Sequence, residues 1–258
     1  MKSKADIVGN WLPRYTGVQP ADLGQCVLLT NFGGYLDRFC EMTGAQIVDE
    51  ERPMPTATAD DISMINFGMG SPNAATIMDL LTAAGPMAVL FLGKCGGVKR
   101  KNQIGDLILP IAAIRGEGTS NDYLPPEVPA LPAFQLQRVV STMIRDLDHD
   151  YWTGTVFTTN RRVWEHDEEF KAYLRKTRAM AVDMESATIF AAGFANEIPT
   201  GALLLVSDQP MIPEGVKTEQ SDRGVTARFV DDHIRIGIEA LKLLRRQGRS
   251  VKHLRFDE

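Results

Sequence analysis

The chain has 258 residues, of which 44% are hydrophobic and 24% charged, and its formal net charge at pH 7 is −5. This composition is typical of a soluble globular protein whose core needs no disulfide or metal to support it. The sequence contains no basic block and no run of the ~20 apolar residues that a membrane span requires, so we expect neither a nucleic-acid nor a membrane partner.

The cysteines indicate a reducing compartment. Cys26, Cys40 and Cys95 share no spacing typical of a disulfide framework or a zinc site, and the four histidines show no metal-ligand spacing. The first residues, MKSKADIVGNW, lack the apolar region of a signal peptide. We therefore expect a cytoplasmic protein without a metal.

The N-terminal segment, about residues 1–25, is predicted to form a turn-rich arm. It contains the motif WLPRYTG at residues 11–17. One interpretation is an arm held on its own chain by Trp11 and Tyr15. The other is an arm that crosses a subunit interface and offers Arg14 to an anion.

Three apolar strands are predicted next, each ending in a turn that contains glycine. The strands are expected at residues 26–30, 62–67 and 87–92, the turns at 31–34, 68–73 and 93–97, and helices at 35–42 and 73–83. Because glycine lets the backbone approach a ligand closely, these turns are candidates for a binding site.

The second half of the chain alternates strands and helices. Strands are expected at residues 103–110, 151–159 and 201–206, helices at 134–147, 167–178 and 226–246, and polar loops at 115–123 and 211–224. The alternation predicts an α/β fold with a mixed sheet and helices on both faces.

Two acidic residues stand at the ends of one helix-plus-strand unit in this half. Glu185 precedes a run of small and apolar residues, and the strand at 201–206 ends on Ser207 and Asp208. Ligands of α/β proteins collect at the carboxyl ends of strands, so both carboxylates are predicted to reach one crevice.

These motifs resemble the nucleoside phosphorylase and nucleosidase superfamily of the hexameric purine nucleoside phosphorylase type, from Trp11 to about Leu244. The resemblance rests on residues 11–17, 93–98, 104–106, 115–120, 182–185 and 207–208. Within the superfamily, residues 14–17, 158–162 (TTNRR) and 207–210 (SDQP) are most similar to the catalytic domain of the AMP nucleosidases.

The resemblance implies a three-layer α/β/α fold, with residues 1–258 as one catalytic domain. It also implies cleavage of the N-glycosidic bond of AMP, without a cofactor, by a homo-oligomer. The expected oligomer is a hexamer in which a neighbour's N-terminal arm completes each site. Longer members carry an N-terminal domain linked to ATP regulation, for which this chain has no room, so weak ATP activation is expected.

The resemblance also assigns roles to four residues. Met184 would pack under the ribose, Glu185 would hold its 2′ and 3′ hydroxyls, Asp208 would act at purine N7, and Ser207 would help to set the Asp208 carboxyl. The chemistry is sound, because a general acid at N7 neutralises the departing base. Asp208 must then hold a proton in a dry site, while Glu185 is expected to stay ionised.

The sequence departs from the phosphorylases where they bind inorganic phosphate. Phe91 stands at a position where they place an arginine, so water is the expected nucleophile. Candidates for gripping a 5′-phosphate are Arg14, Lys94, Arg161 and Arg162, and Asn160 and Thr119 are further candidate substrate contacts.

Two other functions remain open. A nucleoside phosphorylase would need free phosphate, and a methylthioadenosine-type nucleosidase would reject a 5′-phosphate. A non-enzymatic nucleotide sensor is disfavoured, because a binding protein does not need an acid at N7.

Overall fold

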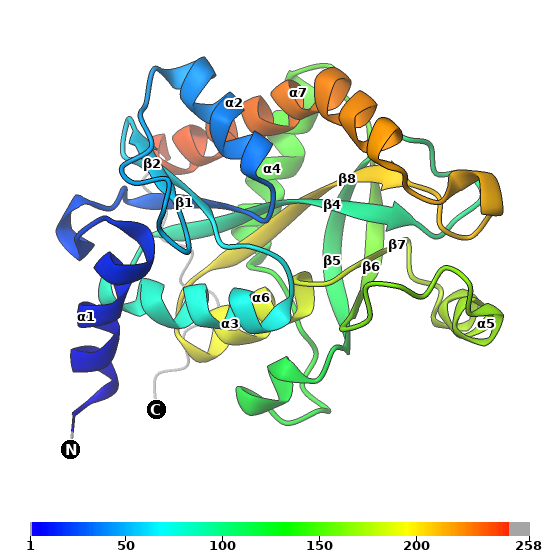
Figure 1. Cartoon of the computed structure of the whole chain (residues 1–258), viewed down its shortest axis with the longest axis horizontal. Helices are drawn as coiled ribbons and strands as arrows, with labels where there is room; N and C mark the ends of the chain where they lie inside the picture. Colours follow the sequence, from blue (N-terminus) through cyan, green and yellow to red (C-terminus); the bar gives the residue numbers. More distant parts are fainter. Residues whose placement is uncertain (1, 248–258) are drawn as a thin grey trace.

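A mixed eight-stranded sheet runs through the protein, and helices cover both of its faces (Figure 1). The computed structural model describes residues 2–247. The strands are β1 (Cys26–Thr30), β2 (Thr56–Ala59), β3 (Ile62–Asn66), β4 (Ala88–Gly97), β5 (Leu107–Gly116), β6 (Tyr151–Thr159), β7 (Ala181–Asp183) and β8 (Thr200–Asp208). The α-helices are α1 (Lys4–Thr16), α2 (Gly33–Thr43), α3 (Ser71–Leu80), α4 (Phe134–Asp146), α5 (Glu168–Thr177), α6 (Ser186–Ala195) and α7 (Glu219–Arg246).

The strand order brings the ends of distant segments together. The sheet runs β2-β3-β1-β4-β7-β6-β5-β8, and β8 also pairs in parallel with β4. Strands β4, β7, β6, β5 and β8 therefore close into a hydrogen-bonded ring. The carboxyl ends of β4 and β8, which are parallel, lie side by side, which is where ligands collect in α/β proteins.

The central strands are buried on both faces, as their continuous apolar sequences predict. Alternate side chains of one strand enter different cores. In β4, Leu90 and Leu92 pack with α2, α4 and α7, whereas Val89 and Phe91 pack with α1, α3 and α6. The predicted α/β class, with a mixed sheet between two helical layers, is thus confirmed. Within the described residues, no helix is both long and apolar enough to cross a membrane.

The predicted glycine turn at residues 93–97 is wrong, because β4 continues through it. Glycine is required at these positions because neighbouring rings occupy the space of a side chain. A Cβ on Gly93 would lie 2.4 Å from the Phe91 ring, and one on Gly96 would lie 2.7 Å from the Pro210 ring. Because glycine has no side chain, the rings of Phe91 and Pro210 can pack against the backbone of β4. The strand continues without interruption and places Lys94 and Cys95 near its carboxyl end.

The N-terminal segment is helical rather than turn-rich. Helix α1 begins with a capping box between Ser3 and Asp6 and ends at Gly17 in a left-handed conformation. Val8 and Leu12 bury one face of it against the α3 and α6 layer. The segment is therefore held on its own chain, with those two aliphatic residues as its buried anchors.

Helix α7 begins earlier than predicted. The sequence suggests a loop up to Gly224, but Thr218 and Ser221 form a capping box and the helix runs from Glu219. A Cβ at Gly224 would meet nothing within 4 Å, so this glycine is tolerated inside the first turns. The polar loop after β8 is correspondingly short, and it carries Lys217 to the end of the sheet.

Candidate active site

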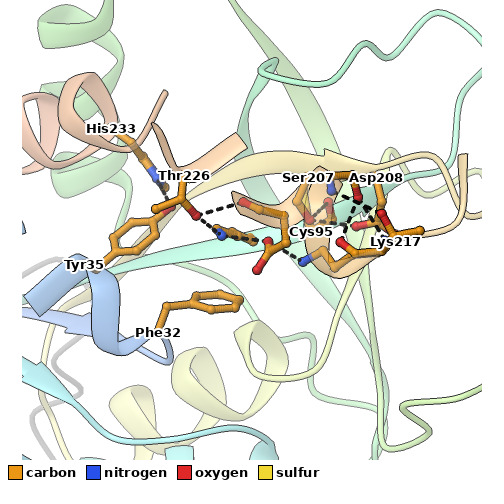
Figure 2. Close-up of polar contacts among 12 residues, drawn as sticks. Phe32, Tyr35, Cys95, Ser207, Asp208, Lys217, Thr226 and His233 are labelled. Carbon is orange, nitrogen blue, oxygen red and sulfur yellow. Dashed lines mark hydrogen bonds and ion pairs between the residues drawn. The ribbon is translucent and has the colours of Figure 1, made fainter. Parts of the chain in front are cut away.

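A pocket opens where β1, β4, β6, β7 and β8 end. Its lining gathers residues that are far apart in the sequence: Asn31, Phe32, Met69, Lys94, Cys95, Gly96, Thr159, Arg161, Arg162, Trp164, Glu165, Val182, Asp183, Met184, Glu185, Ser207, Asp208, Pro210 and Lys217. Figure 2 shows Ser207, Asp208 and Lys217 grouped at the end of β8, with Cys95 beside them. Glu185 and Asp208 thus share one pocket, as the sequence predicts.

Backbone groups fix Glu185 in place. The Gly70 N–H donates to its Oε1 at 2.8 Å, and the Met184 N–H donates to its Oε2 at 3.2 Å. Gly70 has a φ of 94°, a conformation that suits glycine and turns its N–H toward the carboxyl. Ser71 Oγ donates to the Met184 carbonyl at 2.6 Å, so α3 and the Met184–Glu185 segment are fastened together. Gly70 also holds the N-cap position of α3.

The charge of Glu185 is set by burial and by Asp183. Together they raise the pKa of Glu185 to about 8, against the opposing hydrogen bonds from Gly70, Met184 and the Asn31 side chain. Burial raises the pKa of Asp183 as well, and the hydrogen bonds that it accepts from Thr158 Oγ1 at 2.7 Å and from the Ser186 N–H at 2.8 Å oppose that rise. Near neutral pH, Glu185 therefore holds a proton, which differs from the prediction of an ionised Glu185.

Asp208 lies at the other end of the pocket, at the end of β8. Burial raises the pKa of Asp208. The Ser207 hydroxyl donates to its Oδ1 at 2.7 Å, and the positive charges of Lys217 and Arg162 also oppose the rise. A carboxyl whose proton is held more tightly than usual suits a general acid. The contact between Ser207 and Asp208 has the geometry that the sequence predicts.

One predicted cation, Lys94, is buried and already paired. Its Nζ lies 2.8 Å from Asp222 Oδ1 and 2.9 Å from Thr226 Oγ1, both on α7. Lys217 shares Asp222 at 3.2 Å, and both ammonium groups lie over the Phe32 ring, at 4.6 and 5.6 Å from its centroid. Lys94 and Lys217 therefore form a basic wall between α7 and the pocket.

The two predicted arginines, Arg161 and Arg162, both line the pocket but differ in how strongly other side chains hold them. Arg161 is 2.8 Å from Asp167, which caps α5, and its guanidinium lies over the Phe170 ring at 5.3 Å. Arg162 makes a longer ion pair of 3.3 Å with Glu165 and is half-exposed. Arg162 is thus the freer of the two to bind an anion.

The remaining predicted site residues lie in different places. Met184 lines the pocket between Asp183 and Glu185. Among the residues that the structure describes, the lining does not include Arg14, Asn160 or Thr119. Arg14 is exposed on α1, Asn160 is exposed just after β6, and Thr119 starts a short 3-10 helix.

The lining also includes residues to which the sequence analysis assigns no role, among them Asn31, Glu165, Asp183 and Lys217. Two of them carried a signal, because Asn31 follows β1 and Asp183 ends β7, positions typical of ligand contacts. Glu165 and Lys217 lie on loops, and only the folded chain brings them to Asp208.

The fold and the paired carboxylates define the class of protein. A family model described as the phosphorylase superfamily matches residues 26–242, and the chain belongs to this superfamily. This confirms the resemblance drawn from the sequence motifs.

Within this superfamily, the chain is similar to two AMP nucleosidases. The chain is 55% identical to AMP nucleosidase from Bacteroides thetaiotaomicron VPI-5482, whose crystal structure matches with a TM-score of 0.86 over 95% of this chain and 99% of that one. It is 31% identical to AMP nucleosidase of Escherichia coli (strain K12), over 92% of this chain. The chain spans 58% of the length of that relative. Uridine phosphorylase of Treponema pallidum (strain Nichols) is 25% identical over 89% of this chain.

Proposed function

We propose that this chain, acting as a single catalytic domain, hydrolyses the N-glycosidic bond of AMP to adenine and ribose 5-phosphate. One observation carries the proposal: two carboxyls with raised pKa values, the buried Glu185 and the partly buried Asp208, share a pocket with four basic side chains. The similarity to two AMP nucleosidases supports the choice of substrate.

The two carboxyls divide the work. Asp208 donates its proton to purine N7 as the bond to the sugar breaks, so the base leaves without a full negative charge. Glu185 holds the ribose hydroxyls, with Met184 packed against the sugar. The neighbouring carboxylate of Asp183 adds negative charge near a sugar that becomes positive, which favours the oxocarbenium-like transition state.

Water rather than phosphate is the nucleophile in this proposal. Phe91 is fully buried and packs against Phe67, with 5.8 Å between the ring centroids. Lys94 is held by Asp222 and Thr226. A phosphate dianion at this place would find no arginine from β4 to bind it in the bidentate manner typical of such sites.

The 5′-phosphate of AMP is bound by the basic side chains of the pocket. Lys94, Lys217, Arg161 and Arg162 all line it, and Arg162 has the weakest internal partner. We assign Arg162 the main contact and the other three basic side chains supporting contacts. These assignments distinguish AMP from a nucleoside with a neutral 5′ group.

The assembly we propose is a homohexamer with sites shared between subunits. Arg14 is exposed on α1 with its guanidinium 5.9 Å from the Trp11 ring centroid, and both side chains face outward. A neighbour's Arg14 would add a charge that a single chain does not bring to its own pocket. The three free cysteines fit a reducing cytoplasm.

The test is product analysis with AMP and with adenosine, each with and without inorganic phosphate. The proposal expects adenine and ribose 5-phosphate from AMP without phosphate. Cleavage that depends on phosphate would make the chain a phosphorylase. Faster cleavage of adenosine than of AMP would overturn the role of the basic side chains.

A further inference from the structure

Glu165 is a pocket carboxylate to which the proposed reaction gives no role. It lines the same pocket as Asp208, and its side chain is only 16% exposed. The backbone N–H of Trp164 donates to Oε2 at 2.9 Å, and Arg162 approaches Oε1 at 3.3 Å. These two contacts orient the carboxylate and leave lone pairs on both oxygens for a ligand.

Glu165 and Asp208 line the same pocket, and the charge of Arg162, which contacts Glu165, also acts on Asp208. The negative charge of Glu165 contributes to the raised pKa of Asp208, whereas Arg162 lowers it. Asp208 as a proton donor and Glu165 as an acceptor are therefore two hydrogen-bonding groups of opposite character in the lining of one pocket.

The edge of a purine base beside N7 has a matching pattern. In adenine, N7 accepts a hydrogen bond and the neighbouring 6-amino group donates one. In a 6-oxopurine, N7 and O6 both accept. A donor and a carboxylate placed side by side therefore complement the 6-amino purine, and the carboxylate repels the oxygen of the 6-oxo purine.

We propose that Glu165 is a specificity-determining residue that accepts a hydrogen bond from the 6-amino group of the base and excludes 6-oxopurine nucleotides. The inference rests on the proposed function for the position of N7 at Asp208. The inference adds to that function a residue, Glu165, that selects between 6-amino and 6-oxo purines. Arg162 orients the carboxylate through the 3.3 Å contact, while its remaining N–H groups bind the 5′-phosphate.

The test compares kcat/KM for AMP and for IMP in the wild type and in Glu165→Gln. The wild type should prefer AMP by about 10- to 100-fold, the range expected from one correctly placed hydrogen-bonding pair. Glutamine keeps the size of the side chain but also offers an N–H to O6. The preference should therefore fall by about tenfold in Glu165→Gln, through a gain on IMP as well as a loss on AMP.

The matched control is Glu169→Gln, which neutralises an exposed glutamate at the start of α5. Its preference should equal that of the wild type. A wild type that cleaves IMP as well as AMP would overturn the proposal, and so would a Glu165→Gln preference within about twofold of the wild type.

Binding distinguishes this inference from the proposed reaction. Calorimetric titration of Asp208→Asn with AMP and with IMP measures the preference without turnover. Absence of AMP cleavage by the wild type would reject the proposed function, while equal affinities for AMP and IMP would reject the role of Glu165.

Discussion

The two ends of the pocket are built in different ways. At the Glu185 end, the carboxyl is buried and is held by the backbone N–H groups of Gly70 and Met184. At the Asp208 end, one hydroxyl holds the carboxyl, and the charged side chains of Lys217, Arg162 and Glu165 surround it. All three of these charged side chains come from loops rather than from strands.

The comparison shows which property of each carboxyl, its position or its pKa, a single substitution nearby can change. Backbone donors fix geometry, so the Glu185 end is preorganised and resists substitution of neighbouring side chains. Movable charges set the proton affinity of Asp208, so single substitutions at that end change its pKa without moving it. In the proposed reaction, the rigid end holds the sugar, and acid strength and base selection are adjusted at the other end.

The largest expected effect comes from removing the acid. Asp208→Asn should lower kcat for AMP by about 10²- to 10⁴-fold, because an amide cannot give a proton to N7. Affinity for AMP should be retained, which calorimetry can measure. A kcat within about threefold of the wild type would remove Asp208 from the acid role.

Arg162→Ala tests whether the freer arginine recognises the phosphate. It should lower kcat/KM for AMP about 10- to 100-fold more than for adenosine, as expected for a lost charge-assisted hydrogen bond. The matched variant is Arg161→Ala, whose guanidinium is engaged by Asp167 and should change the AMP-to-adenosine ratio less. Equal losses on both substrates in Arg162→Ala would show that it does not bind the phosphate.

Glu185→Gln should alter both rate and stability. The rate with AMP should fall about 10- to 100-fold through weaker contacts to the ribose. For stability, the raised pKa of about 8 means that the folded protein keeps a proton that the unfolded chain releases at lower pH. Stability of the wild type therefore falls as pH rises toward 8, and the glutamine variant lacks this loss.

Thermal unfolding measures this effect directly. Relative to the wild type, Glu185→Gln should gain about 8–16 °C in Tm between pH 5 and pH 8.5, which corresponds to roughly 4 kcal/mol in a protein of this size. A difference in Tm that is the same at both pH values would contradict a protonated, buried Glu185.

The smallest effect is expected from Lys217→Met. The positive charge of Lys217 lowers the pKa of Asp208, so its removal should raise that pKa further. Since the acid form is active, the alkaline limb of the pH profile of kcat/KM should move to higher pH. Lys101→Met, which changes an exposed lysine, is the control and should leave the limb in place. A limb that moves to lower pH would contradict the assigned direction.

Much of the fold was predictable from the sequence because the strands are continuous and apolar. The strands ending at Thr30 and Asp208 follow from their apolar sequences. Glu185 and Asp208 line one pocket as predicted, because acids at strand ends lie where ligands collect in α/β proteins. The turn predicted at residues 93–97 is wrong because glycine, which usually indicates a turn, lies within a strand here. At Gly93 and Gly96 it instead makes room for the rings of Phe91 and Pro210.

The electrostatic details of the site were not predictable in the same way. Glu165 and Lys217 come from separate loops, and their effect on Asp208 exists only in the folded chain. The protonation of Glu185 likewise depends on burial and on the nearby Asp183, neither of which local sequence determines. The role of Arg14 depends on a neighbouring subunit and stays a prediction.

The most direct test of proton donation at N7 compares AMP with its 7-deaza analogue, in which carbon replaces N7, in the wild type and in Asp208→Asn. If Asp208 protonates N7, the wild type should cleave the analogue as slowly as Asp208→Asn cleaves AMP, and the two changes together should cost little more than either alone. Rapid cleavage of the analogue by the wild type, or losses that multiply in the combination, would contradict Asp208 as the acid at N7.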